Sequence, residues 1–175
     1  MVEAALNHLE GNDDIELHVF GPKPHWKRGA EDHFRKAGRF HGSLSPDKLM
    51  NRVPEFDAIL VTMSFEPSLK RRMMTSFPSK LIEGVQHGLP LIVWGPDYCS
   101  GIEWAKSDSR ALCVTDSKAA ALYDEIMKYK NARGRIDLDL FHESSRFAAE
   151  NEFDPKTIRH DFRDILETVT CKSLS

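Results

Sequence analysis

The stretch that most constrains the fold is Leu89–Trp94, a continuous apolar run with β-branched members that ends at Gly95-Pro96. Such a run between turn signals is typical of a strand buried on both faces of a parallel sheet. The preceding Pro78–His87 predicts a short helix, because proline suits a first helical turn and Gly88 can end a helix in the left-handed conformation. A helix is therefore followed directly by a central strand, as in α/β proteins.

The helix predicted at 78–87 has two different faces. Leu81, Ile82 and Val85 form an apolar face that would pack on the sheet, whereas Lys80 and Glu83 lie one turn apart on another face. The simpler interpretation is a solvated ion pair that stabilises the helix by about 0.2–0.5 kcal/mol. The functional interpretation is a ligand site, in which the lysine meets an anion and the glutamate accepts hydrogen bonds from hydroxyl groups.

The residues from Pro78 to Ile92 read P-S-K-L-x-E-x-x-x-x-G-x-P-L-I, and Gly101-x-Glu103 follows after a short loop. Over roughly residues 14–169 the chain resembles the donor-binding half of GT-B glycosyltransferases, especially the group 1 and family 4 types. The resemblance implies that Glu83 binds the ribose hydroxyls of a nucleotide-diphosphate sugar, UDP- or GDP-linked, and that Lys80 lies near its diphosphate.

The same resemblance assigns further donor contacts. It implies that the turn at Phe40 and His41 holds the edge of the nucleobase through its backbone, and that Ser79 faces the diphosphate. Electrostatics agrees for Ser79, since free N–H groups and the positive end of a helix favour an anion. Gly95 and Gly101 would let the backbone approach the donor closely. The plainer interpretations are a core strand residue at Phe40 and a simple chain reversal at Gly95.

The sequence departs from the family pattern at one position. Many relatives carry another glutamate eight residues before the ribose-binding one, where it meets the donor sugar, and here that residue is Thr75. Glu66, in the same loop, is a candidate replacement, so the identity of the donor sugar is not assigned.

In this superfamily the acceptor site and, in inverting members, the general base lie on the other half, so no catalytic residue is assigned. No metal or cofactor is expected, because the implied fold neutralises phosphate with cations and helix ends.

Composition narrows the class of protein. The 175 residues predict a single domain, residues 1–175, with 41% hydrophobic and 29% charged residues, typical of a globular protein. A net charge of −3 does not favour a nucleic-acid partner. The three cysteines form no C-x-x-C pair, and no apolar run or leader pattern suggests a membrane span or export. We expect a cytoplasmic protein, at most at the inner face of the membrane.

The remaining pattern alternates helices and strands. Strands are predicted at 15–20, 38–42, 57–63 and 110–115, and helices at 2–9, 27–36, 45–52, 102–106, 116–130, 137–151 and 154–170. The apolar residues of the last helix predict a stripe facing the core: Ile158, Phe162, Ile165, Leu166 and Val169.

The long connection at 64–77 carries the basic run Lys70-Arg71-Arg72. The plainer interpretation is a solvated, partly helical loop. The functional alternatives are attraction of the donor's phosphates and peripheral contact with an acidic membrane surface. Loops of this length usually have a function or a structure of their own.

Together these elements predict one doubly wound, mostly parallel, Rossmann-like sheet with helices on both faces and strand order 3-2-1-4-5-6. The family alignment starts this chain at the helix after strand 1. We therefore expect a truncated or half glycosyltransferase, whose acceptor-binding half is supplied in cis or by a partner chain, or another segment in the gap. The alternative is a non-catalytic binding or assembly module of the same fold. An unrelated nucleotide binder is disfavoured, because G-x-G-x-x-G and the P-loop pattern are absent.

Overall fold

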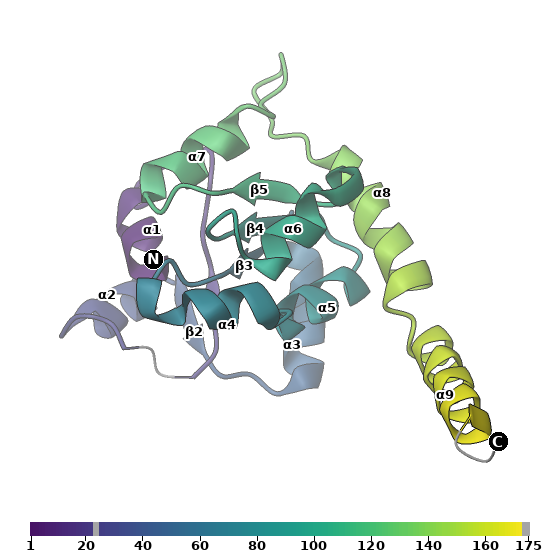
Figure 1. The fold of residues 1–175 in the computed structure, drawn as a ribbon. Helices are drawn as coiled ribbons and strands as arrows, with labels where there is room; N and C mark the ends of the chain where they lie inside the picture. Colours follow the sequence, from purple (N-terminus) through teal and green to yellow (C-terminus); the bar gives the residue numbers. More distant parts are fainter. Residues whose placement is uncertain (23–24, 173–175) are drawn as a thin grey trace.

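The computed structural model describes residues 1–22 and 25–172, with side chains described as far as residue 166. This part of the chain is an α/β protein with two small parallel sheets (Figure 1). A three-stranded sheet has the order β3-β4-β5, and a two-stranded sheet pairs β1 with β2. The strands are β1 (Val19–Phe20), β2 (Phe40–Gly42), β3 (Ile59–Thr62), β4 (Leu91–Trp94) and β5 (Leu112–Val114).

Helices connect and cover these strands. The α-helices are α1 (Val2–His8), α2 (Ala30–Lys36), α3 (Pro46–Arg52), α4 (Lys70–Thr75), α5 (Ser79–Gln86), α6 (Ser100–Lys106), α7 (Ala119–Met127), α8 (Asp139–Phe147) and α9 (Pro155–Lys172). Short helical turns lie at η1 (Val53–Glu55), η2 (Pro67–Leu69) and η3 (Ser107–Ser109), and η4 (Ala148–Glu152) is a π-helix. The predicted end of α5 is confirmed, because Gly88 has a positive φ of 69°.

The central strand is β4, and every one of its residues is buried. Leu91 and Val93 point into a core cluster shared with α5 and α6, whereas Ile92 and Trp94 point into a second cluster shared with α1 and α7. The alternation of side chains along a strand explains this division. Helices therefore cover both faces of the three-stranded sheet, as the sequence predicted for its continuous apolar run.

The strands form two sheets and not one, because β1 and β2 pair apart from β3-β4-β5. The gap between them lies where the predicted order lacks its strand 1, so the division is compatible with that order. No ladder joins β1 to β3 within the described ranges, and both are edge strands. The carboxyl end of β1 instead packs near the start of β3, where the rings of Phe20 and Phe56 lie 5.6 Å apart. Helix α1 contributes to the cores beside both sheets, through Ala5 on one side and Leu6 on the other.

The first strand is shorter than the predicted 15–20. The backbone N–H groups of Asp14 and Ile15 both donate to the side-chain oxygen of Asn12, at 2.9 Å. A local turn of this kind occupies donors that a strand would need for its ladder. Regular pairing therefore begins only at Val19.

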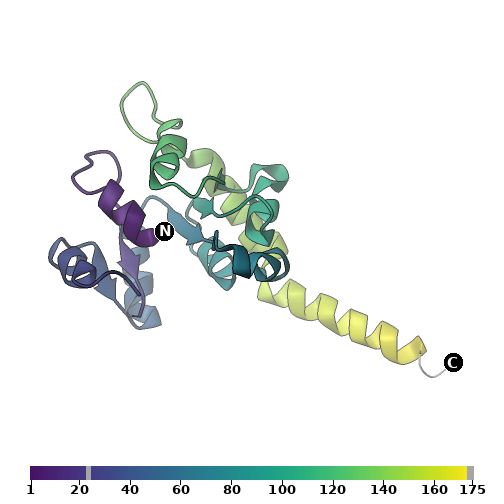
Figure 2. The ribbon, with the colours of Figure 1, turned by 60° about the vertical axis from the view of Figure 1, so that its left-hand side comes forward.

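The predicted inward stripe of the last helix is also wrong. Helix α9 extends away from the rest of the molecule (Figures 1 and 2). Four of the five predicted core residues are 48–61% exposed: Ile158, Phe162, Ile165 and Leu166. The fifth, Val169, lies outside the described side chains. An apolar stripe specifies which face of a helix seeks a partner, but it does not say where that partner lies.

Candidate functional site

Helix α5 presents the Lys80–Glu83 pair on its outer surface. Leu81 and Val85 are fully buried against the sheet, which fixes the helix rotation. On the exposed side, the Lys80 ammonium donates to the Glu83 carboxylate at 2.8 Å, and the two side chains are 76% and 57% exposed. Both charged groups are therefore open to solvent and to a ligand.

The start of α5 lies against the start of α6. A Cβ atom at Gly101 would come within 3.2 Å of the Pro78 ring, and the Ser100 hydroxyl donates to the Ser76 carbonyl at 2.8 Å. Pro78 caps α5 without a side-chain hydrogen bond, so Ser79 begins the helix with first-turn N–H groups that need other partners. Ser79, Lys80 and Gly101 are thereby brought to one region, which carries the positive end of the α5 dipole.

Gly95 holds the carboxyl ends of the strands together. Its backbone N–H donates to the Val114 carbonyl at 3.0 Å, which links β4 to β5. A Cβ atom at this position would lie 2.5 Å from the Cβ of Met63, just after β3. Gly95 is therefore required for strand packing, whatever it does for a ligand.

Phe40 and His41 lie in the other sheet, and no hydrogen bond or ion pair joins them to α5 in the part of the chain that the structure describes. Phe40 is only 3% exposed, and the Arg35 guanidinium lies 4.8 Å from the centre of its ring. This is the core position that the plainer interpretation gives. The His41 ring is stacked on Phe20, with ring centres 4.5 Å apart.

His41 belongs to a polar cluster that the sequence did not reveal. His18 Nδ1 lies 3.0 Å from His41 Nε2, and its other ring nitrogen lies 3.1 Å from the Glu16 carboxylate. Burial lowers the pKa of His41, and the positive charges of His18 and Arg52 lower it further. The hydrogen bond from His18 is the largest cause that lowers the pKa of Glu16. A neutral His41 is thus favoured at neutral pH.

A weak signal for this cluster was present in the sequence. Glu16, His18 and Phe20 alternate along one face of an extended segment, as a strand requires. Their partner His41 lies 23 residues beyond His18, however, and only the β1–β2 register brings the two rings together.

Thr75, which stands where relatives carry the glutamate, and Glu66, its candidate replacement, both have local partners. The Thr75 hydroxyl donates to the Arg71 carbonyl at 3.0 Å within α4. The Glu66 carboxylate accepts from the Ser68 hydroxyl at 3.3 Å and is otherwise exposed. The Glu66 carboxylate therefore remains accessible to a ligand.

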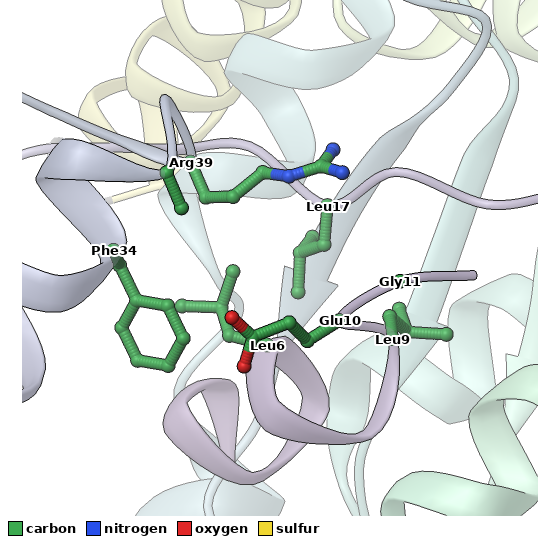
Figure 3. A pocket seen from close by; sticks show the side chains of 8 residues that line it. Leu6, Leu9, Glu10, Gly11, Leu17, Phe34 and Arg39 are labelled. Carbon is green, nitrogen blue, oxygen red and sulfur yellow. The ribbon is translucent and has the colours of Figure 1, made fainter. Parts of the chain in front are cut away.

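Two hollows lie away from the Lys80–Glu83 face. A cavity of about 220 Å³ between α1, α2 and the residues that precede β1 and β2 is lined by Leu6, Leu9, Leu17 and Phe34, with Glu10 and Arg39 beside them (Figure 3). It is smaller than the about 300–1,000 Å³ of typical ligand pockets. A more open hollow of about 580 Å³ lies where Met1 meets residues 62–66, after β3. No residue of α5 lines either hollow, and the Lys80 and Glu83 side chains are 76% and 57% exposed, so the candidate site lies on an open surface.

The described residues were also compared with the requirements of a metal site and of a membrane-spanning helix. No group of three or more histidine, cysteine, aspartate or glutamate side chains there is arranged to hold a metal ion. None of the helices described combines the length and the apolarity needed to cross a bilayer.

No family model matches the sequence, and no curated protein matches it. The glycosyltransferase resemblance therefore rests on the residues quoted for it, above all Lys80 and Glu83.

Proposed function

We propose that this chain is the donor-binding half of a GT-B-type glycosyltransferase and binds a nucleotide-diphosphate sugar at the start of α5. A Rossmann-like, doubly wound arrangement is part of this proposal, and the covered parallel sheet β3-β4-β5 supports it. The observation that carries the proposal is the exposure of Lys80 and Glu83 on one face beside the first turn of α5.

Each group has a chemical role in this proposal. The Glu83 carboxylate accepts hydrogen bonds from the two ribose hydroxyls, while Lys80, Ser79 and the helix end meet the diphosphate. During glycosyl transfer, negative charge builds on the leaving diphosphate, and these positive groups stabilise it.

The internal ion pair does not block this use. Exposed ion pairs contribute about 0–1 kcal/mol, because water solvates both charges and the side chains lose freedom when they pair. Ribose hydroxyls and phosphate oxygens can replace that contact, since hydrogen bonds to charged groups contribute about 1.5–3 kcal/mol each. The pair therefore holds both side chains over the same face until a ligand separates them.

The acceptor and the catalytic base are assigned to another half, in cis or on a partner chain. The break between β1 and β3 is compatible with a strand supplied by another segment, since the predicted order places strand 1 there. No cofactor is required, since the nucleotide sugar itself is the activated substrate.

The proposal is tested by titrating the chain with UDP-, GDP- and ADP-sugars under NMR or calorimetric observation. We expect one base to bind at millimolar or lower concentration, and Glu83→Ala to weaken binding about tenfold or more through lost hydrogen bonds. The matched control is Glu125→Ala, because Glu125 and Lys128 form an ion pair of the same i,i+3 spacing, at 2.6 Å, at the end of α7.

Two outcomes would contradict the proposal. One is no binding of any nucleotide sugar by a folded chain, which favours the non-catalytic module. The other is binding that Glu83→Ala and Glu125→Ala weaken equally, which would place the ligand elsewhere.

A further inference from the structure

The residues 67–77, here called the basic segment, combine cations and exposed apolar side chains. They comprise η2, α4 and the two residues that follow. The cations, all exposed, are Lys70, Arg71 and Arg72. The exposed apolar side chains are Leu69 at 36%, Met74 at 51% and Phe77 at 38%.

The basic segment is anchored by its inner face. Met73 is half-buried and packs against the core cluster that lies under α5 and α6. At 100° per residue, Arg71 lies about 160° around α4 from Met73 and so faces outward. Lys70 is held at the side, with its ammonium 4.9 Å from the centre of the Tyr98 ring. The outer surface of α4 is therefore fixed by the core and not free to rotate.

The cations of the basic segment are not neutralised by the protein. None of the ion pairs formed by the residues that the structure describes includes Lys70, Arg71 or Arg72. Glu66, which precedes the basic segment, accepts a hydrogen bond from the Ser68 hydroxyl. Three consecutive positive charges thus face solvent beside apolar side chains.

We propose that the basic segment docks on an anionic lipid surface. Cations near such a surface are attracted to its headgroups, and exposed apolar side chains gain by entering the interface. A soluble phosphate would use the cations alone and would leave Met74 and Leu69 in water. The interleaving of both kinds of side chain is what favours a membrane surface as the occupant.

Docking in this way places α5 near the headgroups, because Ser79 follows the basic segment after a single residue. The inference does not depend on nucleotide-sugar binding. It concerns other side chains, and its test contains no nucleotide.

The test is co-sedimentation of the full chain with vesicles of phosphatidylcholine alone or of equal parts phosphatidylcholine and phosphatidylglycerol. We expect partitioning onto the anionic vesicles only, weakening as salt is added. Arg71→Ala should lower the partition coefficient about fivefold, since each cation near an anionic surface contributes about 1 kcal/mol. The charge-matched control is Arg133→Ala, because Arg133 is an exposed cation in the distant turn after α7.

Met74→Ser separates insertion from simple charge attraction. The variant keeps all three cations, and we expect it to partition severalfold less because it loses apolar surface. Equal partitioning onto both vesicle types, no partitioning, or unchanged partitioning of Arg71→Ala or Met74→Ser would overturn the inference. Displacement by inorganic diphosphate at constant ionic strength would also overturn it, by showing that the segment binds soluble phosphate.

Discussion

Gly95 and Met63 approach so closely that a Cβ atom on the glycine would lie 2.5 Å from the Cβ of the methionine. Both follow neighbouring parallel strands, so this contact sets how tightly β3 and β4 end together. The same contact closes the edge of the sheet from which the connections to α4 and α6 leave. It predicts that position 95 accepts no larger residue without backbone movement.

We expect Gly95→Ala to lower the free energy of unfolding by about 1–3 kcal/mol, the usual cost of overpacking. Urea unfolding followed by circular dichroism measures this loss. The comparison is Gly84→Ala, whose Cβ would lie 2.8 Å from the flexible end of the Leu91 side chain, which can move. A loss in Gly84→Ala as large as that in Gly95→Ala would contradict the expectation.

Two glutamates should differ sharply in their effect on stability. Glu83→Ala removes an exposed pair and should change the free energy of unfolding by less than about 1 kcal/mol. Glu152 is only 24% exposed at its side chain and accepts from both Trp104 and Arg110 at 2.9 Å. Glu152→Ala should therefore cost about 1–3 kcal/mol, because it leaves half-buried donors without their acceptor. Similar losses in the two variants would show that one of these contacts is misassigned.

Two phenylalanines on the last helices test the position of α9. Phe162 is 61% exposed, so Phe162→Ser should change the free energy of unfolding by at most about 0.5 kcal/mol. Phe141 is 3% exposed in the core beside α7, and Phe141→Ser should cost at least about 3 kcal/mol. Thermal and urea unfolding of both variants provides the check. A large loss in Phe162→Ser would mean that α9 packs against the domain.

Burial raises the pKa of the Cys113 thiol from its ordinary value of 9.0 to about 11. Between these values the unfolded chain has lost the thiol proton while the folded protein keeps it. The unfolded state then binds fewer protons, so the free energy of unfolding falls as pH rises from 9 to 11. Urea unfolding across this range should give a flatter dependence for Cys113→Ala.

The slope should not disappear in that variant, because burial also raises the pKa of Cys99. An identical slope in Cys113→Ala and in the unaltered protein would contradict the assignment.

Local sequence signals correctly predicted several helix boundaries and the central strand. The helix predicted at 45–52 is α3, Gly88 marked the end of α5, and the apolar run at Leu89–Trp94 predicted the buried β4. These features depend on backbone conformation and side-chain spacing over a few residues, which the sequence carries directly. The placement of Lys80 and Glu83 on an exposed helix face follows from the same periodicity.

Tertiary structure alone decided which elements meet. The contact of His18 with His41 and the projection of α9 both depend on distant pairings. A pattern of apolar residues predicts that a helix face will be buried or that a strand will pair. Which element becomes the partner depends on the total free energy of packing. The sequence by itself thus determined the helices, the central strand and the charged face of α5, whereas the arrangement around them came from contacts that no local pattern encodes.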